Sequence, residues 1–141
     1  MQFQAYNRIL LCKDPLENIF VAGRAYGYQF RIRYPSYRGT FLSCIEQLEF
    51  YIDGEKIESS AIRFCINNKE FLLTQLPDQY KEYWFILDKA TIIVLRDGGI
   101  PQGNHTIRVV MRHRIPYAGY GGSYLSLPSD ITEIRSTAGG N

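Results

Sequence analysis

The sequence predicts an all-β protein: a single domain built as an antiparallel β-sandwich, jelly-roll-like in its connections. Apolar and polar residues alternate with period two, the pattern of strands whose side chains point to opposite faces of a sheet. These segments are short, are separated by turns rich in Gly, Pro, Asn and Asp, and leave little room for helices. We expect the sandwich to occupy residues 1–127 of the 141-residue chain.

The clearest strand covers residues 28–34, YQFRIRY. A second strand over residues 48–52 ends at Asp53-Gly54, a dipeptide that supplies the positive φ angles of a tight hairpin, and Ile57 is expected to begin the return strand. The residues predicted to face the core from these two strands are Tyr28, Phe30, Ile32, Tyr34, Leu48, Phe50 and Ile52.

Three further regions complete the expected sheet. Residues 61–66 and 71–76 read as strands on either side of an Asn-Asn turn, and residues 83–96 read as two short strands around Asp88-Lys89. The last long strand is expected at residues 105–115, HTIRVVMRHRI. Residues 77–84 could hold only a short helical connector. The polar tail, residues 128–141, is expected to be disordered or ordered only by a partner.

Composition argues against several function classes. The formal charge is +2, with sixteen basic and fourteen acidic residues interspersed, so attraction to nucleic acid or to an anionic membrane is not indicated. No apolar run is long enough to span a membrane, and no signal segment opens the chain, which predicts a cytoplasmic protein. The three cysteines form no CxxC pair and are expected to be reduced, mostly buried thiols: Cys12, Cys44 and Cys65.

Candidate catalytic chemistry is sparse. The two histidines, His105 and His113, lie at opposite ends of one predicted strand, roughly 26 Å apart at the strand rise, so they cannot share one metal ion within a monomer. We expect His113 to be a hydrogen-bonded histidine at the rim of the sheet. Neither a GxSxG elbow nor a phosphate-binding loop is present. The sequence therefore predicts no catalytic residue, no metal site and no cofactor in this chain.

Two loops carry recognition-type residues. Residues 33–41 display Tyr37 and Arg38, and a later Tyr/Gly loop displays Tyr117, Tyr120 and Tyr124. Tyrosine and arginine are enriched at binding hot spots, and glycine lets a backbone approach a partner closely. The alternative is that both loops merely cover the open ends of the sandwich.

Arginines also alternate along two predicted strands. They are Arg31, Arg33, Arg108, Arg112 and Arg114, and they could form one basic sheet face. A solvated face with neighbouring acids, or a subunit contact, is the preferred interpretation over an anion site.

The sequence resembles the beta subunit of bacterial C-glycoside deglycosidases in two blocks, residues 16–57 and 104–117, and in the Tyr/Gly loop that follows the second block. The resemblance runs from about residue 7 to residue 124 and includes no catalytic signature. It implies a β-sandwich subunit that works only with a larger, barrel-fold alpha subunit. That alpha subunit would hold the catalytic histidine and a divalent metal, typically manganese, so no catalytic residue is transferred to this chain.

The reaction implied by the resemblance is cleavage of the carbon–carbon bond between a sugar and a flavonoid-type aglycone. A 3-oxo group would acidify the hydrogen at position 2, so that a base could remove it and the aglycone could depart by elimination. The five loop residues would then serve at a subunit contact or at the substrate entrance.

Two other readings stay open. One is a carbohydrate-binding sandwich in which Trp84 or surface tyrosines stack on sugars, although Trp84 lies in the apolar run YWFIL, which looks like core. The other is a self-assembling structural protein whose tyrosine loops hold a homo-oligomer together. A beta subunit should co-purify with a larger neighbour, whereas a self-assembling protein should behave well alone.

Overall fold

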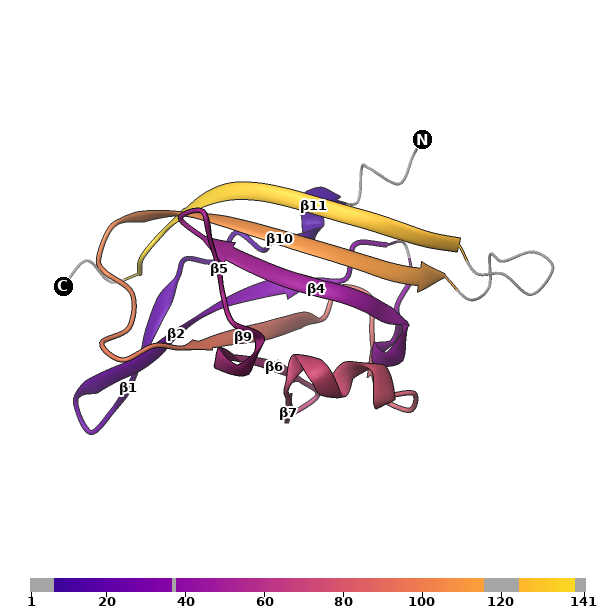
Figure 1. Cartoon of the computed structure of the whole chain (residues 1–141), viewed down its shortest axis with the longest axis horizontal. Coiled ribbons are helices and arrows are strands. Elements are labelled where there is room, and N and C mark those ends of the chain that lie inside the picture. Colours follow the sequence, from indigo (N-terminus) through magenta and orange to yellow (C-terminus); the bar gives the residue numbers. More distant parts are fainter. Residues whose placement is uncertain (1–6, 37, 116–124, 139–141) are drawn as a thin grey trace.

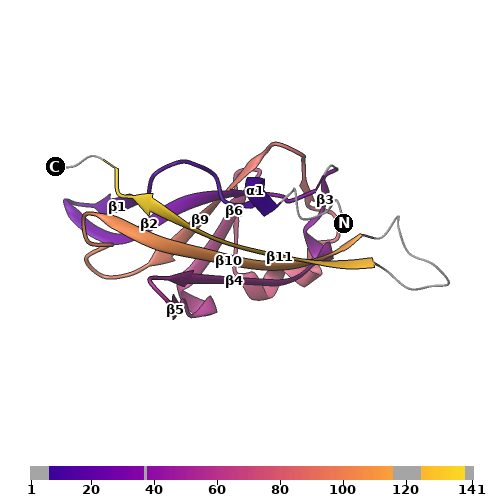
Figure 2. The ribbon, with the colours of Figure 1, turned by 90° about the horizontal axis from the view of Figure 1, so that it is seen from above.

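The computed structural model describes residues 7–36, 38–115 and 125–138, and it shows two antiparallel sheets facing each other (Figures 1 and 2). One sheet has the strand order β1-β2-β9-β6-β7 and the other β11-β10-β4-β5, while β3 and β8 form a separate two-stranded ribbon. The predicted all-β sandwich architecture is confirmed.

The first sheet contains β1 (Glu17–Val21), β2 (Arg24–Arg33), β6 (Ile62–Ile66), β7 (Lys69–Phe71) and β9 (Lys89–Leu95). The second contains β4 (Ile45–Ile52), β5 (Glu55–Lys56), β10 (Asn104–Ile115) and β11 (Leu125–Ser136). The ribbon pairs β3 (Thr40–Phe41) with β8 (Tyr83–Trp84), and the short helices are α1 (Asn7–Leu10), η2 (Leu42–Cys44), η3 (Ser59–Ala61) and η4 (Leu73–Asp78).

The core lies between the two sheets and is built from the alternating residues. All seven side chains predicted to face inward are buried. Phe30 of β2 meets Phe50 of β4 edge to face, with ring centroids 5.5 Å apart, so this pair joins one sheet to the other. Fully burying a side chain of this size contributes about 2–3 kcal/mol.

The hairpin between β4 and β5 confirms the turn read from Asp53-Gly54. Both residues have positive φ, 51° and 85°, which right-twisted hairpin strands require at a two-residue turn. The return strand is only Glu55–Lys56, so Ile57 follows it instead of beginning it. Ile57 still packs against the core.

The strand predicted over residues 71–76 is wrong beyond its first residue. Only Phe71 belongs to a strand, and Leu73–Asp78 form the 3₁₀ helix η4. The Leu72 N–H donates to Gln75 Oε1 at 2.8 Å and the Gln75 N–H donates to the Leu72 carbonyl at 3.0 Å, so a local turn satisfies the backbone that a strand would have offered to a neighbour.

The predicted tail is also wrong, since most of it is strand β11. This strand pairs with β10 along its whole length, from Ile115 opposite Leu125 to Asn104 opposite Ser136. β11 is an edge strand, so it needs few apolar residues, and Pro128 is tolerated there because one side of an edge strand lacks a partner. The boundary expected after residue 127 therefore falls inside a strand.

The segment before β1 lies against the end of β11. The Leu16 N–H donates to the Ser136 carbonyl at 2.9 Å, and the Ala138 N–H donates back to the Leu16 carbonyl at 2.7 Å. Leu16 is fully buried, so this junction ties the segment before β1 to the end of β11. Within the described ranges, no helix is long and apolar enough to cross a membrane.

Candidate functional site

The loop that carries Arg38 packs onto β8. Gly39 approaches this strand so closely that an added Cβ would collide with the Trp84 carbonyl oxygen and the Tyr83 ring. Only glycine permits this contact, which fixes where the loop lies. Arg38 itself is exposed, and its role in binding stays a prediction. Tyr37 lies outside the described residues, so its role stays a prediction.

Exposed apolar side chains gather on this ribbon. The rings of Phe41 and Tyr83 lie 5.0 Å apart edge to face, and those of Tyr83 and Phe85 lie 4.8 Å apart. The exposed fractions are 43% for Phe41, 57% for Phe85, 37% for Ile86 and 69% for Leu87. We call these four residues and Tyr83 the aromatic patch. Figure 2 shows β3 at the end of the molecule away from β5.

The loop after β8 is held in place from inside the core. Trp84 is fully buried, and its indole Nε1–H donates to the Asp88 carbonyl at 2.8 Å. The Asp88 N–H donates to the Phe85 carbonyl at 3.1 Å and closes a turn. Leu87 sits in this turn with φ of 75°, a conformation that bulky residues adopt only when their surroundings impose it. The loop is therefore preformed, with its apolar side chains outward.

The patch was missed by the sequence analysis because YWFIL was interpreted as core. A usable signal was present, since five consecutive apolar residues cannot all face inward from a strand of period two. Tyr117, Tyr120 and Tyr124, in contrast, were singled out and lie outside the described residues. They remain predictions, and Arg38 is the one candidate that the structure locates.

His113 differs from expectation. It is only 1% exposed, and neither ring nitrogen has a hydrogen-bond partner within the described part of the chain. The prediction of a hydrogen-bonded histidine at the rim of the sheet is therefore wrong. The ring packs edge-on against Tyr34 with centroids 4.9 Å apart. Burial lowers its pKa to about 4, although Glu46 acts in the opposite direction. His113 is therefore neutral at pH 7 and belongs to the core.

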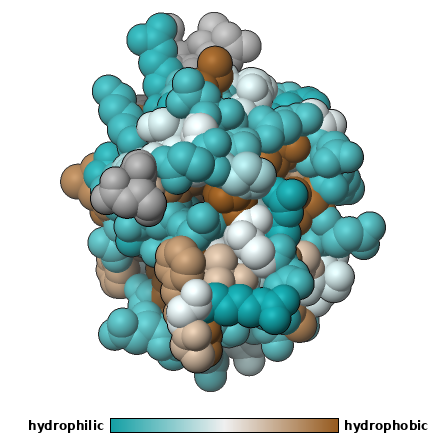
Figure 3. Space-filling model, turned by 90° about the vertical axis from the view of Figure 1, so that its left-hand side faces the viewer, coloured by the Kyte–Doolittle hydropathy of each residue, from teal (hydrophilic) through white to brown (hydrophobic). Residues whose placement is uncertain are grey.

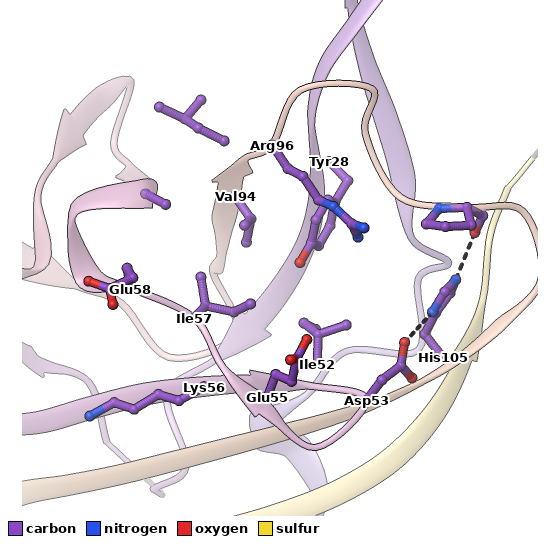
Figure 4. A pocket seen from close by; sticks show the side chains of 13 residues that line it. Tyr28, Ile52, Asp53, Glu55, Lys56, Ile57, Glu58, Val94, Arg96 and His105 are labelled. Atoms are coloured by element: carbon purple, nitrogen blue, oxygen red, sulfur yellow. Dashed lines mark hydrogen bonds and ion pairs between the residues drawn. The ribbon is translucent and has the colours of Figure 1, made fainter.

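The opposite end of the sandwich is hollowed. Figure 3 faces this end, where apolar atoms lie in a depression among hydrophilic side chains, and Figure 4 shows the residues that line it. The hollow has a volume of about 480 Å³. Its walls come from strands of both sheets and from the segment after β9, and include Tyr28, Ile52, Val94, Arg96 and His105.

His105 is held between two acceptors in this hollow. Its Nδ1 lies 2.7 Å from Asp53 Oδ2 and its Nε2 lies 2.7 Å from the Pro101 carbonyl oxygen (Figure 4). Because a carboxylate and a carbonyl can only accept, both nitrogens donate when the ring is an imidazolium. Burial alone would lower the pKa of His105, but these two hydrogen bonds outweigh it and raise the pKa.

Asp53 completes a structural clamp. Its Oδ1 accepts from the Thr106 N–H at 2.9 Å, and the hydrogen bond with His105 is the main reason that its pKa is lowered. With both ring nitrogens engaged, His105 has no lone pair to offer as a base or metal ligand. In the described ranges, no group of three His, Cys, Asp or Glu side chains could hold a metal ion.

We predict that His105→Gln lowers the free energy of unfolding by about 1 kcal/mol at pH 6, and by less at pH 8.5. A raised folded-state pKa gives a contribution that is full below pH 6.5, the unfolded value, and is lost as pH rises through the folded pKa. Urea unfolding at the two pH values measures this. An equal loss at both would contradict the imidazolium clamp.

The arginines do not form one face. Arg31 lies in β2 and pairs with Asp14 at 3.1 Å, whereas Arg108 lies in β10 of the other sheet and pairs with Asp130 at 2.7 Å. A single basic face is therefore wrong. The expected neighbouring acids are confirmed, and exposed pairs of this kind contribute little to stability.

The three cysteines are free. Cys12 and Cys44 are buried and Cys65 is half-buried. Burial raises the pKa of the Cys12 and Cys65 thiols, so these two are not activated as nucleophiles at neutral pH.

The described chain is a β-sandwich with a preformed, exposed apolar loop after β8 and a histidine clamp at the opposite end. Comparison with known families then gives a specific assignment. The sequence model of the C-glycoside deglycosidase beta subunit family matches residues 6–117. The chain belongs to this family, which confirms the resemblance read from residues 16–57 and 104–117.

Individual relatives agree with the assignment. A C-glycoside deglycosidase beta subunit of Eubacterium cellulosolvens is 35% identical over 86 residues, which cover 61% of this chain and 58% of the relative. A 3'-dehydrocarminate deglycosidase beta subunit of a Microbacterium species is 35% identical over 101 residues, which cover 72% of this chain and 76% of the relative. A C-glycoside deglycosidase beta subunit of Arthrobacter globiformis is 33% identical over 90 residues, which cover 61% of this chain and 66% of the relative. The chain thus spans under two thirds of the Eubacterium relative.

Proposed function

We propose that this chain is the small, non-catalytic beta subunit of a C-glycoside deglycosidase complex. The observation that carries the proposal is the family match over residues 6–117, which includes both sheets except β11. The names of the relatives as beta subunits support a hetero-oligomer with a larger partner. The partner in this proposal is an alpha subunit of barrel fold.

The reaction we assign to the complex is a lyase-type elimination. The substrate is a C-glycoside of a flavonoid-type aglycone whose sugar has a ketone at position 3. That ketone acidifies the hydrogen at position 2, a base takes this proton, and the electron pair forms a double bond between carbons 1 and 2 as the aglycone carbon leaves and is protonated. A divalent metal, manganese, would stabilise the enolate charge.

Catalysis is assigned to the alpha subunit, which would carry the base and the metal. The described side chains of this chain support that division. His105 has both nitrogens engaged, His113 is sealed in the core, and the thiols of Cys12 and Cys65 are held protonated. The free cysteines fit a reducing compartment, and we place the complex in the cytoplasm.

Within the complex, this chain would stabilise its partner and form part of the substrate entrance. Tyr117, Tyr120 and Tyr124 are the first candidates for these contacts, with Tyr37 and Arg38 second. A carbohydrate-binding role centred on Trp84 has little support, since this side chain is fully buried and cannot stack on a sugar.

We expect turnover of a 3-oxo C-glucoside only when this chain and the larger subunit are mixed with manganese. Each chain alone should be inactive, because one lacks the catalytic groups and the other lacks the subunit it needs. Chromatographic detection of released aglycone measures the reaction. Activity of this chain alone would refute the non-catalytic role, and an inactive, unassociated mixture would refute the complex.

A further inference from the structure

We propose that the aromatic patch is the centre of the surface through which this chain contacts the larger subunit. The proposal rests on the proposed function and specifies which part of the sandwich performs the assembly. The patch lies wholly inside the region that matches the beta subunit family, and its members are Phe41, Tyr83, Phe85, Ile86 and Leu87.

The patch has the composition of an interface core. Large aromatic and aliphatic side chains that touch one another and remain exposed are typical of the core of a protein interface, and charged residues are depleted there. No charged residue lies between Tyr83 and Leu87, whereas Glu82 and Asp88 directly adjoin this segment and Arg38 lies in the neighbouring loop. An apolar centre with a polar rim is the arrangement that excludes water from binding hot spots.

The loop that carries the patch is preorganised. Ordering a loop on binding lowers affinity, and a loop already fixed in the free protein avoids that loss. Here the buried Trp84 indole holds the Asp88 carbonyl, the Phe85–Asp88 turn is closed, and Gly39 lies directly against β8. The turn holds Leu87 in a left-handed backbone conformation, with φ of 75°, and the apolar side chain of this residue is exposed to solvent.

The occupant that suits the patch is another protein chain. The hollow around His105 is lined by other residues, whereas the patch is an outward, exposed loop, a shape that suits contact with a protein surface. The names of the relatives as beta subunits imply a partner subunit, and an interface between unlike chains needs a surface of this kind. Self-association of this chain through the patch is the competing outcome.

Two variants test the patch with little effect on the fold. Leu87→Asn removes the apolar side chain and keeps a residue that tolerates positive φ. Phe85→Ser removes an exposed ring. The matched control is Phe20→Ser in β1, because Phe20 is 62% exposed against 57% for Phe85, yet lies on a different sheet. Thermal unfolding of each isolated variant shows that it remains folded.

The measurement is the dissociation constant for the larger subunit, determined by calorimetry on purified chains and checked by native mass spectrometry. Leu87→Asn and Phe85→Ser are each expected to weaken binding at least about tenfold, whereas Phe20→Ser stays within about twofold. Wild-type binding with no change in either patch variant would overturn this inference and leave the proposed function intact.

The remaining outcomes are equally decisive. No binding of the wild-type chain would refute the proposed function itself. Stronger weakening by Phe20→Ser than by Phe85→Ser would move the interface to the β1–β2 hairpin and overturn the inference. A concentration-dependent dimer of this chain alone, abolished by Leu87→Asn while partner binding persists, would assign the patch to a second copy.

Discussion

Trp84→Ala is expected to lower the free energy of unfolding by about 4 kcal/mol, a large share of the stability of a domain this size. Trp84 is fully buried, its ring lies 5.5 Å from that of Tyr34 and 5.4 Å from that of Phe64, and its N–H bonds to the Asp88 carbonyl. Truncation would leave a large cavity between the ribbon and the five-stranded sheet. Urea unfolding of the isolated chain measures the change.

Trp84→Phe is the matched control. It keeps an aromatic ring in the site but removes the N–H that holds the loop after β8, so we expect a smaller loss of about 1–2 kcal/mol. Hydrogen exchange at the Asp88 amide should accelerate in this variant, because its turn would lose the anchor beneath it. An alanine variant as stable as the wild type would show that Trp84 is not the support of the ribbon.

The free energy of unfolding of the wild type is expected to fall on acidification, and His113→Leu is expected to prevent most of that fall. The folded pKa of His113 is about 4, whereas the unfolded value is about 6.5. Between these values the unfolded chain binds a proton that the folded chain excludes, so stability falls as pH decreases from 6.5 towards 4, by about 3 kcal/mol in total. Leucine cannot titrate, so its curve should stay flatter.

The difference between the wild-type and His113→Leu unfolding curves, taken from pH 7 to pH 4, isolates this effect. Carboxylates such as Asp14 and Asp53 also have lowered pKa values, but they titrate in both proteins and cancel. At pH 7 the variant should be as stable as the wild type or more so, because two unsatisfied nitrogens are removed. Parallel curves would contradict the buried, neutral histidine.

The sequence predicted the parts of the fold that alternation encodes. Strands β2, β4 and β10 each bury every second residue, and the Asp53-Gly54 turn has its own dipeptide signal. Strand β11 was not predicted because its stability comes from pairing with β10, and backbone hydrogen bonds leave little trace in the pattern of side chains. The 3₁₀ helix over Leu73–Asp78 was not predicted because an apolar run of that length fits either a strand or a turn.

The candidate site was predicted less well. Arg38 was named and is exposed, but Phe85 and Leu87 were assigned to the core, since hydropathy cannot tell which residues of an apolar run face outward. His113 was placed at the rim because sequence does not encode which polar groups lie near a ring in space. Family membership was read from the blocks at residues 16–57 and 104–117, which lie within the matched region, residues 6–117.

The junction between Leu16 and Ser136 has a consequence for how the protein is made. The four-stranded sheet is complete only when β11, late in the sequence, pairs back with β10, and the end of β11 then bonds to the segment before β1. A growing chain therefore leaves the ribosome with β1 to β9 complete but their core uncovered, and with the aromatic patch already synthesised. Folding should be slow, because its contacts join distant residues, and the nascent chain would aggregate least when a partner is available to cover the patch.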